Sequence, residues 1–515
     1  METNLAMLAD AALDRFGDYP SLFFGGEWFT SATLHERAVH VGEGFRAAGV
    51  APGDRVVVIM ANCPEVGIVY QALWRAGAVV TPVVFLVTAP ELRHIIDDSG
   101  AVAVVTTAEL APKVAAAQDG AAHAVPVFVV GENFAELEAS APGPIVDRSP
   151  DDLAALMYTG GTTGRSKGVA LSHANLSNAG ASSRSVSHIM GLVRGITALP
   201  LSHSFGLLVT VGGLHTPEPT VSILQRWFEP AEWLRLAAEH RAQTTAVVPS
   251  MLAILLGQRL EDHDLSALEF VFSGAAPLSA AIAAEFERRV PSAKVLEGYG
   301  CTETGGIISS SPPLAPRRGT VGKPVPGVTV RIVGPDGRDV PAGQDGEIVV
   351  RGPNVMANYW RGEPLPDGWF ATGDVGNFDA DGYLTIVDRI KDLILRGGFN
   401  VYPRDVEDAL MTHPAVAMAA VVGRPDERLG EEVIAFVSLA DGLTVTPEEL
   451  VGYARDRLGA HKYPREVRIV EAVPLTSVGK LDRKRLRAGL VSSPVPGPAA
   501  ASEPAPADSP TAAPA

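Results

Sequence analysis

The sequence predicts an α/β protein with a large N-terminal domain of mainly parallel βα layers plus a distorted β-barrel portion, followed by a small α+β C-terminal domain. Short apolar runs alternate with amphipathic helical stretches along the first part of the chain, which is typical of a parallel sheet covered by helices. Tight turns, such as Pro-Asp-Gly at residues 335–337, replace this alternation after Gly327. The elements become short beyond Lys391. We therefore expect domains at residues 1–389 and 390–490, and a disordered Ala/Pro-rich tail at 491–515.

Capping residues and apolar runs place the individual elements. Thr33 and Glu36 have the spacing of a capping box, as do Thr88 and Glu91, and Pro64 suits the first turn of a helix. Predicted strands lie at residues 56–60, from 79 onward, 102–106, 127–130, 196–199, 221–224, 244–248, 269–272, 294–296, 328–333, 347–350, 416–422 and 433–439. Two further helices are expected near residues 404–411 and 447–458.

Charge and cysteine content narrow the class of protein. The net charge of −17 argues against nucleic acid or an anionic membrane as the main partner. Only Cys63 and Cys301 occur, so we expect no disulfide framework and a reducing compartment. The first residues lack a basic, apolar leader, and no apolar stretch reaches the ~18 residues of a membrane span. We expect a soluble cytoplasmic protein whose oligomeric state stays open, a homodimer being one alternative.

A glycine-rich stretch at residues 158–168, Tyr-Thr-Gly-Gly-Thr-Thr-Gly-Arg-Ser-Lys-Gly, lies between two apolar runs. Glycine lets the backbone approach a ligand, and successive N–H groups and Thr hydroxyls form a donor surface suited to phosphate oxygens. It is not a Walker A motif, because Gly168 stands where the Mg-binding hydroxyl belongs and the next helix begins only near His173. A strand–loop–strand phosphate site is expected, formed by Thr159, Gly160, Gly161, Thr162, Thr163, Gly164 and Lys167.

A second stretch, Glu-Gly-Tyr-Gly-Cys-Thr-Glu-Thr at residues 297–304, also follows a predicted strand. Gly298 and Gly300 free the backbone around Tyr299, whose ring offers a flat face to a nucleotide base. Thr302 can donate to a phosphate, and Glu303 is a hard oxygen ligand suited to Mg²⁺. Together with the first loop, these residue types predict nucleotide binding.

Both stretches resemble signature motifs of the adenylate-forming superfamily, which includes acyl-CoA synthetases, firefly luciferase and peptide-synthetase adenylation domains. The superfamily's loop is commonly Y-T-S-G-T-T-G-x-P-K-G; here Gly161 replaces the Ser and Ser166 the Pro. Further stretches at residues 367–374, 388–407 and 474–483 resemble later motifs in the superfamily's order. The resemblance covers almost all of residues 10–490.

The resemblance implies ATP, Mg²⁺ and CoA as cofactor and co-substrates. Tyr299 would pack on adenine, Thr302 would meet the α-phosphate as a catalytic residue, and Glu303 would act in catalysis as the Mg²⁺ ligand. Asp374 and Arg389 would hold the ribose. The remaining nucleotide contacts that it implies are Gly274, Ala275, Ala276, Gly298 and Gly300.

The resemblance also assigns roles to the C-terminal part. Lys480 would be the catalytic lysine, and Lys391 would be the hinge between two domain orientations. Gly397 and Gly398 would line a tunnel for the pantetheine of CoA. Asp388 stands where the superfamily usually has Gly.

The acid substrate is predicted from the residues of its pocket. Residues 200–207, Pro-Leu-Ser-His-Ser-Phe-Gly-Leu, resemble the acyl-pocket motif, so His203, Phe205, Gly206 and, farther along, Val248 are candidates. No Asp lies at 202–204 to pair with an ammonium, and residues 200–214 lack the Arg or Lys that a second buried carboxylate would need. An apolar monocarboxylic acid remains: a medium- or long-chain fatty acid first, an aryl or cinnamate-like acid second.

CoA is the expected acceptor of the acyl group. Only residues 304–321 separate Glu303 from Gly322, which leaves no room for the insertion of ligases that load carrier proteins. We expect acyl-adenylate formation with release of pyrophosphate, then transfer to CoA. The alternatives are an acyl-AMP ligase that loads a carrier protein, a luciferase-like oxygenase, and a non-catalytic acyl- or nucleotide-binding protein; intact Lys480, Glu303 and Asp374 argue against the last.

Overall fold

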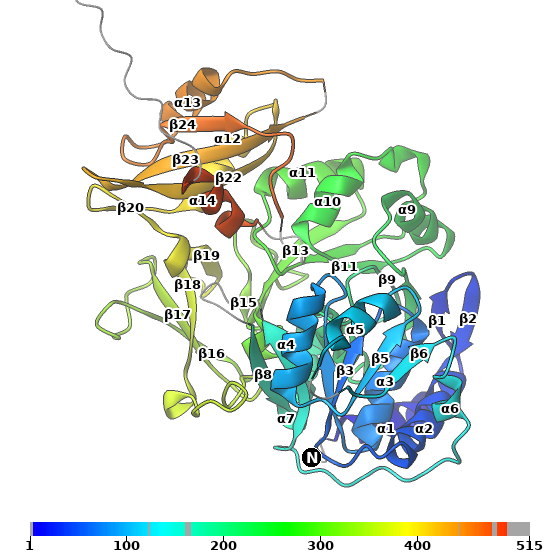
Figure 1. Ribbon diagram of the computed structural model, residues 1–515. Coiled ribbons are helices and arrows are strands. Elements are labelled where there is room, and N and C mark those ends of the chain that lie inside the picture. The colour runs from blue at the N-terminus through cyan, green and yellow to red at the C-terminus, as the bar shows by residue number, and fades with distance from the viewer. Residues whose placement is uncertain (1–3, 122–123, 160–165, 441, 476–480, 492–515) are drawn as a thin grey trace, which may run out of the picture.

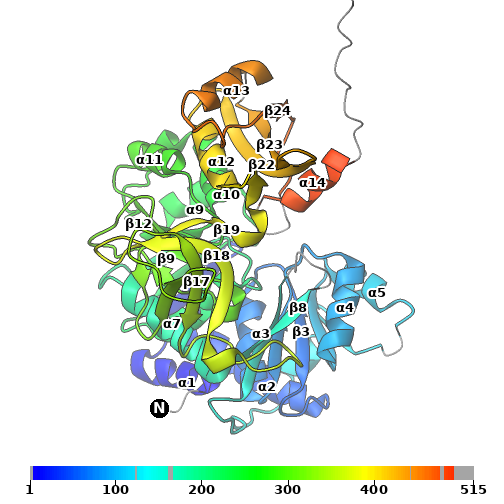
Figure 2. The same ribbon diagram turned by 90° about the vertical axis from the view of Figure 1, so that its left-hand side faces the viewer.

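The computed structural model describes residues 4–121, 124–159, 166–440, 442–475 and 481–491 (Figure 1). Two large sheets with helices form the N-terminal part, and a smaller antiparallel sheet lies beside them. The C-terminal sheet and its helices lie above the rest in Figure 1, and the view in Figure 2 shows the same arrangement from the side.

A six-stranded sheet has the order β6-β5-β3-β4-β7-β8, in which every pair except β7–β8 is parallel. Its apolar strands are buried on both faces, as expected for a sheet covered by helices. The antiparallel strands β7 and β8 flank the glycine-rich stretch, so the two strands predicted around it are confirmed, while residues 160–165 lie outside the described part. The strands are β3 (Arg55–Ile59), β4 (Val79–Pro82), β5 (Ala103–Thr107), β6 (Val127–Val130), β7 (Leu153–Thr159) and β8 (Lys167–Ser172).

A nine-stranded sheet has the order β15-β14-β13-β12-β11-β9-β10-β1-β2. Its central strands, from β13 to β1, are parallel, so their carboxyl ends meet at one edge, where open α/β sheets bind ligands. The strands are β1 (Pro20–Phe24), β2 (Glu27–Thr30), β9 (Arg194–Thr197), β10 (Val221–Leu224), β11 (Thr244–Val247), β12 (Phe270–Ser273), β13 (Lys294–Tyr299), β14 (Ser309–Ser310) and β15 (Lys323–Pro324).

Of the three helix starts predicted from capping boxes or Pro64, two are confirmed. Thr88 and Glu91 form a reciprocal capping box, and Pro64 opens its helix. The predicted box of Thr33 with Glu36 is wrong: the Thr30 hydroxyl, at the end of β2, accepts from Thr33 N and starts the helix three residues earlier. The helices are α1 (Leu5–Phe16), α2 (Ser31–Ala47), α3 (Pro64–Arg75), α4 (Ala89–Ser99), α5 (Ala111–Gln118), α6 (Ala135–Glu138), α7 (His173–Ser187), α8 (Ser204–Gly213), α9 (Pro230–Glu239), α10 (Pro249–Leu256) and α11 (Ala280–Arg289), with short 3₁₀ turns η1 (Leu260–Asp262) and η2 (Thr302–Thr304).

The β-rich portion expected as a distorted barrel is a four-stranded antiparallel sheet in the order β16-β17-β18-β19. Ile348 and Val350 of its second strand are buried in the same core as the six-stranded sheet, so this portion belongs to the N-terminal part. Its elements are β16 (Thr329–Val333), β17 (Gly346–Arg351), η3 (Pro366–Gly368), β18 (Phe370–Phe378) and β19 (Leu384–Arg389).

The C-terminal part is a five-stranded sheet with helices on both faces. α12 and α13 cover one face through residues such as Val406 and Leu450, and α14 covers the other through Leu486. This small α+β unit confirms the predicted fold class. Its elements are η4 (Ile390–Asp392), β20 (Ile394–Arg396), β21 (Phe399–Val401), α12 (Pro403–Met411), β22 (Val416–Asp426), β23 (Gly430–Leu439), α13 (Pro447–Arg455), β24 (Glu466–Ile469) and α14 (Arg483–Val491).

Two further sequence predictions concern the chain ends and the membrane. The predicted tail lies outside the described residues except for Val491. Across the described ranges, no helix combines the length and the apolar character needed to cross a membrane.

Candidate active site

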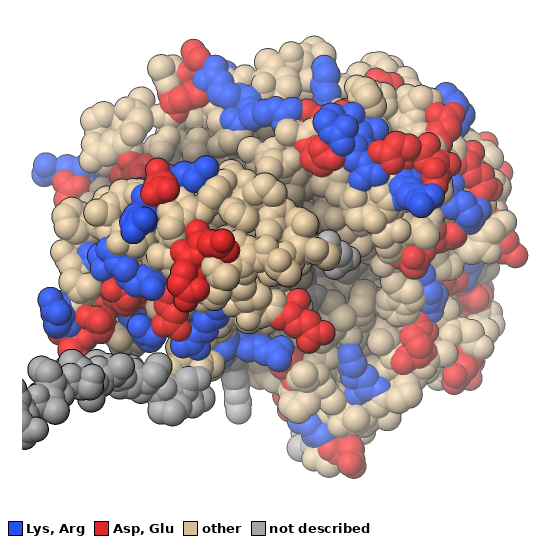
Figure 3. Space-filling model, turned by 90° about the horizontal axis from the view of Figure 1, so that it is seen from above, with Lys and Arg blue, Asp and Glu red and all other residues tan. Residues whose placement is uncertain are grey.

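A cavity of about 1760 Å³ lies where the two parallel sheets meet the C-terminal part. The carboxyl ends of β7, β12 and β13 reach it, as the parallel topology predicts. Figure 3 looks down on this side of the molecule, where the surface is hollowed and Lys and Arg lie interspersed with Asp and Glu. Most of the predicted site residues that the structure describes line this cavity.

Tyr299, Asp374 and Arg389 lie together on its wall. The Tyr299 hydroxyl donates to Asp374 Oδ2 at 2.6 Å, and Arg389 Nε donates to Asp374 Oδ1 at 2.6 Å. Asp374 and Arg389 face each other across β18 and β19, which fixes their geometry. Burial, reinforced by the charge of Asp374, raises the pKa of Tyr299 well above its ordinary value, so the hydroxyl stays protonated. The carboxylate of Asp374 keeps lone pairs that can accept from a diol.

At two turns, the cavity wall is formed by backbone that carries small side chains or none. Ala275 has φ +69°, a left-handed conformation that costs a non-glycine residue roughly 1–3 kcal/mol and that clusters at ligand sites. Its neighbours Gly274 and Ala276 also line the cavity. In the second turn, a Cβ at Gly300 would lie 2.4 Å from the Gly306 carbonyl oxygen, so glycine is required there for packing.

Thr302 and Glu303 follow that turn in η2 and line the cavity. Glu303 Oε1 accepts a hydrogen bond from the Tyr359 hydroxyl at 2.9 Å. Among the described residues, no group of three or more His, Cys, Asp or Glu could hold a metal by itself. One carboxylate facing a nucleotide site fits Mg²⁺ that is held mainly by phosphate oxygens. It does not fit a metal site built from protein ligands alone.

α4 holds both described ends of the glycine-rich stretch. The Tyr158 hydroxyl donates to Asp98 Oδ2 at 2.5 Å, and His94 Nε2 lies 3.0 Å from the Ser166 carbonyl oxygen. The sequence did not indicate this contact; the only trace is the spacing of His94 and Asp98, one helical turn apart.

Across the hairpin, Thr159 pairs with Lys167, whose Nζ lies 5.7 Å from the centroid of the Tyr359 ring. The ammonium is thereby placed near the side of the cavity that carries Glu303. The other predicted phosphate residues, which fall outside the described part of the chain, are Gly160, Gly161, Thr162, Thr163 and Gly164.

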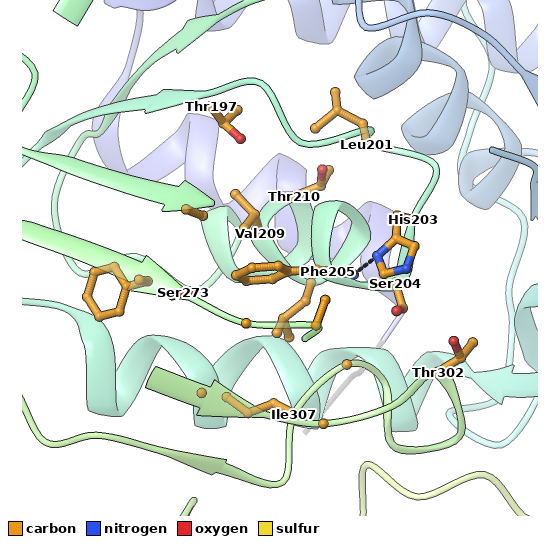
Figure 4. Close-up of a pocket in the computed structure, with 18 of the residues that line it drawn as sticks. Thr197, Leu201, His203, Ser204, Phe205, Val209, Thr210, Ser273, Thr302 and Ile307 are labelled. Atoms are coloured by element: carbon orange, nitrogen blue, oxygen red, sulfur yellow. Dashed lines mark hydrogen bonds between the residues drawn. The ribbon is translucent and has the colours of Figure 1, made fainter. Parts of the chain in front are cut away.

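Helix α8 forms one wall of the part of the cavity that Thr197 and Ser273 also line, which we call the inner cavity (Figure 4). His203 is its N-cap: Nδ1 accepts from Phe205 N at 3.2 Å, which leaves Nε2 to carry the proton of a neutral ring. The Phe205 ring lies across the cavity, on the side of Ser273.

Gly206 and Val248 do not line the cavity as predicted. A Cβ at Gly206 would lie 2.2 Å from the Pro200 carbonyl oxygen, so this glycine permits the turn into α8. Val248 precedes α10 and packs in the neighbouring core. Both residues therefore lie one layer behind the cavity lining.

Polar residues from inside and outside the stretch 200–214 line the inner cavity. Its lining includes Thr197, Thr210 and Ser273, and also Arg184 from α7. Arg184 precedes the acyl-pocket motif in the sequence, and no local signal marks it, because an Arg on a helix is ordinarily a surface residue. The sequence therefore missed a cation that the fold brings to the cavity.

The C-terminal part presents both described ends of the predicted lysine loop to the cavity. Leu475 and Leu481 pair in an antiparallel bridge, and Asp482 N donates to the Pro474 carbonyl oxygen at 2.9 Å. Arg483 Nη2 then donates to both oxygens of buried Glu407, at 2.7 and 2.8 Å, and anchors the chain after the loop. Lys480 itself lies outside the described residues.

The predicted hinge and tunnel residues lie in different places. Lys391, in η4, lines the cavity, whereas Gly397 and Gly398 lie in the β20–β21 turn away from it. Both glycines have positive φ, and a Cβ at Gly398 would meet nothing within 4 Å. The next residue, Phe399, is 59% exposed. The ends of the lysine loop, not this turn, face the cavity in this orientation.

The comparisons with known proteins agree with this geometry. The chain matches the AMP-binding enzyme family over residues 9–360 and the AMP-binding enzyme C-terminal domain over residues 405–480. It therefore belongs to the AMP-binding enzyme family, within the adenylate-forming superfamily, as the motifs predicted.

Its relatives place it among the acyl-CoA ligases. Feruloyl-CoA synthase from Amycolatopsis sp is 38% identical over 472 residues, 90% of this chain and 94% of the relative. Long-chain-fatty-acid–CoA ligase from Yersinia pestis is 34% identical over 536 residues, 94% of this chain and 93% of the relative. The crystal structure of ATP-bound MatB from Rhodopseudomonas palustris has a TM-score of 0.87 at 32% identity, covering 96% of this chain and 99% of that one.

Proposed function

We propose that this protein is an AMP-forming ligase that activates a monocarboxylic acid with ATP and transfers the acyl group to CoA. The observation that carries the proposal is one cavity shared by three groups: the Tyr299–Asp374–Arg389 cluster, the acid wall of α8, and the ends of the lysine loop. All three are needed if a carboxylate is to meet the α-phosphorus of a bound nucleotide.

Each residue has a task in the adenylation step. Asp374 and Arg389 hold the ribose, Tyr299 packs on the adenine, and Gly274, Ala275 and Ala276 border the base. Thr302 donates to the α-phosphate. Lys480 stabilises charge that grows on the phosphoryl oxygens during attack; the loss of such a contact typically costs about 3–4 kcal/mol.

The β- and γ-phosphates leave on the side of the cavity that β7 and β8 form. Thr159, Lys167 and the loop between them hold the β- and γ-phosphates and release them as pyrophosphate. Glu303 holds Mg²⁺, which when bound would neutralise part of the phosphate charge. For the second step, rotation about Lys391 would bring the Gly397–Gly398 turn to the cavity to admit CoA.

For the acid, two classes are supported by different observations. An aryl or cinnamate-like acid is supported by the Phe205 ring, the Thr and Ser hydroxyls of the inner cavity, and the similarity to feruloyl-CoA synthase. A fatty acid is supported by the similarity to long-chain-fatty-acid–CoA ligase and by apolar side chains such as Val209 on α8. We put the aryl class first, because hydroxyls in a cavity favour a ligand that can hydrogen-bond.

Two measurements on the full chain test the activity. Purified protein with ATP and Mg²⁺ should release pyrophosphate only when an acid is added, and should consume CoA in equal amount. Ferulic, cinnamic and dodecanoic acids span the two classes. ATP binding without pyrophosphate release for any acid would leave a binding protein and would sink the proposal.

A variant separates the two half-reactions. Lys480→Ala should abolish adenylation and largely retain thioester formation from a supplied acyl-adenylate. Lys294→Ala, an exposed lysine at the start of β13 outside the cavity, is the control and should change neither step. Equal loss of both steps in Lys480→Ala would contradict the role given to the lysine.

A further inference from the structure

We propose that the inner end of the acid cavity is a polar subsite in which Arg184 binds an acceptor oxygen at the end of the acid remote from its carboxyl group. This inference rests on the proposed function, because it names the class of acid that the same cavity takes. That class comprises acids with a hydroxyl, ether or carboxylate oxygen at their far end, in preference to acids of equal length that end in hydrocarbon.

Helix α8 runs from the end of the cavity near Thr302, where the carboxyl group of the acid would react, to this subsite. Its first residue, Ser204, lies against Gly306, where an added Cβ would be 3.0 Å from the Ser204 carbonyl oxygen. Figure 4 shows Thr302 and Ser204 at this end and Val209 farther along the helix. The ten residues of α8 span about 15 Å. The far end of the helix is therefore separated from Thr302 by roughly the length of one extended acid molecule.

α7 brings Arg184 to that far end. The two helices pack closely, because a Cβ at Gly180 of α7 would lie 2.8 Å from the Val211 side chain of α8. One turn after Gly180, Arg184 lines the cavity together with Gly213, the last residue of α8. Ser183 and Ser187, on the same helix as Arg184, and Thr220, just before β10, also line the cavity with their hydroxyl-bearing side chains.

The guanidinium of Arg184 has few hydrogen-bond acceptors among the described residues. A guanidinium offers five N–H donors. Among the described residues, its hydrogen bond is a 3.5 Å contact with Thr216 Oγ1, and its buried Nε has no partner. Burial lowers the pKa of Arg184, against the opposing effect of Glu218, yet an arginine stays protonated. Buried donors without acceptors are costly, and an acceptor on a ligand would relieve that cost.

Glu218, whose negative charge acts on Arg184, is engaged by other groups. Glu218 Oε1 accepts from Gly191 N at 2.8 Å and lies 3.0 Å from His188 Nε2. Burial, with the charge of Arg184, lowers the pKa of His188, so this histidine adds little positive charge at neutral pH. Arg184 also lies in the last turn of α7, where a cation favours the helix dipole. That structural role would not make turnover depend on the far end of the acid.

Matched acids test the subsite in the intact enzyme. Dodecanoic, ω-hydroxydodecanoic and dodecanedioic acids differ only at the far end, and cinnamic and para-hydroxycinnamic acids give a shorter pair. Wild type should prefer a polar-ended member by about tenfold in kcat/KM, the size of one hydrogen bond to a charged group. The hydroxy and dicarboxylic arms distinguish a neutral from an anionic acceptor.

Three variants locate the effect. Arg184→Met should reduce the preference about tenfold, and Arg184→Lys should retain part of it because a cation remains. Arg15→Met is the control: Arg15 Nη1 donates to the Thr216 carbonyl oxygen but Arg15 does not line the large cavity, so the preference should not change.

Three outcomes would contradict the subsite or the proposed function. A wild-type enzyme without preference for any polar-ended acid overturns the subsite even if Arg184→Met fails to fold. The same ratio in wild type and a folded Arg184→Met overturns it as well. No pyrophosphate release with any acid of the panel overturns the proposed function itself, and this inference with it.

Discussion

Asp374 is the side chain that organises the part of the cavity wall to which we assign the ribose. Its two oxygens accept from Tyr299 and Arg389, so one buried carboxylate orients an aromatic ring and a cation at once. A ligand diol can be recognised there without rearrangement of the strands, because β18 and β19 already hold the pair in register.

Asp374→Asn should raise the KM for ATP by about tenfold or more with a smaller change in kcat, because an amide has only one acceptor oxygen and hydrogen bonds to charged groups contribute about 1.5–3 kcal/mol. Asp379→Asn is the matched control, since Asp379 pairs with Arg317 in the β18–β19 turn and lies outside the cavity. Initial rates at varied ATP measure both. An unchanged KM in Asp374→Asn would remove this residue from the ribose site.

Glu297 gives a prediction about pH. Burial raises the pKa of this carboxyl to about 7, with Arg404 opposing and Asp408 reinforcing the shift. A carboxyl whose pKa is raised on folding stabilises the protein below its unfolded pKa, and this contribution is lost as pH rises toward about 7. The Tm of wild type should therefore fall relative to that of Glu297→Gln between about pH 4.5 and 7. Parallel Tm profiles for the two proteins would contradict this assignment.

At the scale of elements, α8 depends on the turn that precedes it. Pro200 and Leu201 pass so close to Gly206 that a methyl group there would overlap their backbone. The same turn sets His203 as the helix cap and points Phe205 into the cavity. The shape of the cavity wall that α8 forms is thus decided by a residue that does not itself line the cavity.

Gly206→Ala should lower the free energy of unfolding by about 1–3 kcal/mol, the usual cost of overpacking. Gly213→Ala in the same helix is the control: nothing lies within 4 Å of its added Cβ, so stability should stay equal or rise by about 0.5 kcal/mol. Urea unfolding without ligands measures both. Equal stability of the two variants would mean that the turn into α8 adjusts freely.

At the scale of the whole molecule, the C-terminal part is joined to β19 by polar contacts. Asp388 Oδ2 accepts from Arg404 N at 3.0 Å, and Arg404 Nη1 donates to the Ile386 carbonyl oxygen at 2.8 Å. These bonds hold the orientation in which the ends of the lysine loop face the cavity. A second orientation, with the Gly397–Gly398 turn at the cavity, would break them.

Gly398→Leu should spare adenylation and block the CoA step, because a side chain would fill the path proposed for pantetheine. Gly442→Leu is the control, as Gly442 also has positive φ and open space around it but lies in another turn of the C-terminal part. Separate assays of pyrophosphate release and thioester formation measure the two steps. Normal thioester output from Gly398→Leu would refute the tunnel.

Much of the fold could be predicted from the sequence. β6 and β10 have the predicted bounds, and the β7–β8 hairpin lies where two apolar runs flank the glycines. These succeed because strand burial and turn chemistry are local. The helix start at Thr30 was missed because two Thr residues three apart offered competing caps, and only the end of β2 decides between them.

The sequence by itself determined the class of protein and placed the residues that we assign to the nucleotide, since the residues of each motif stand close together in the chain. The tertiary structure alone decided which residues line the cavity beside α8. Arg184 enters from α7, whereas Gly206 and Val248 withdraw behind the wall. It also decided that α4 contacts Tyr158 of β7 and Ser166, next to β8. Such contacts join segments far apart in the sequence, and they depend on how helices pack over sheets, which no local pattern encodes.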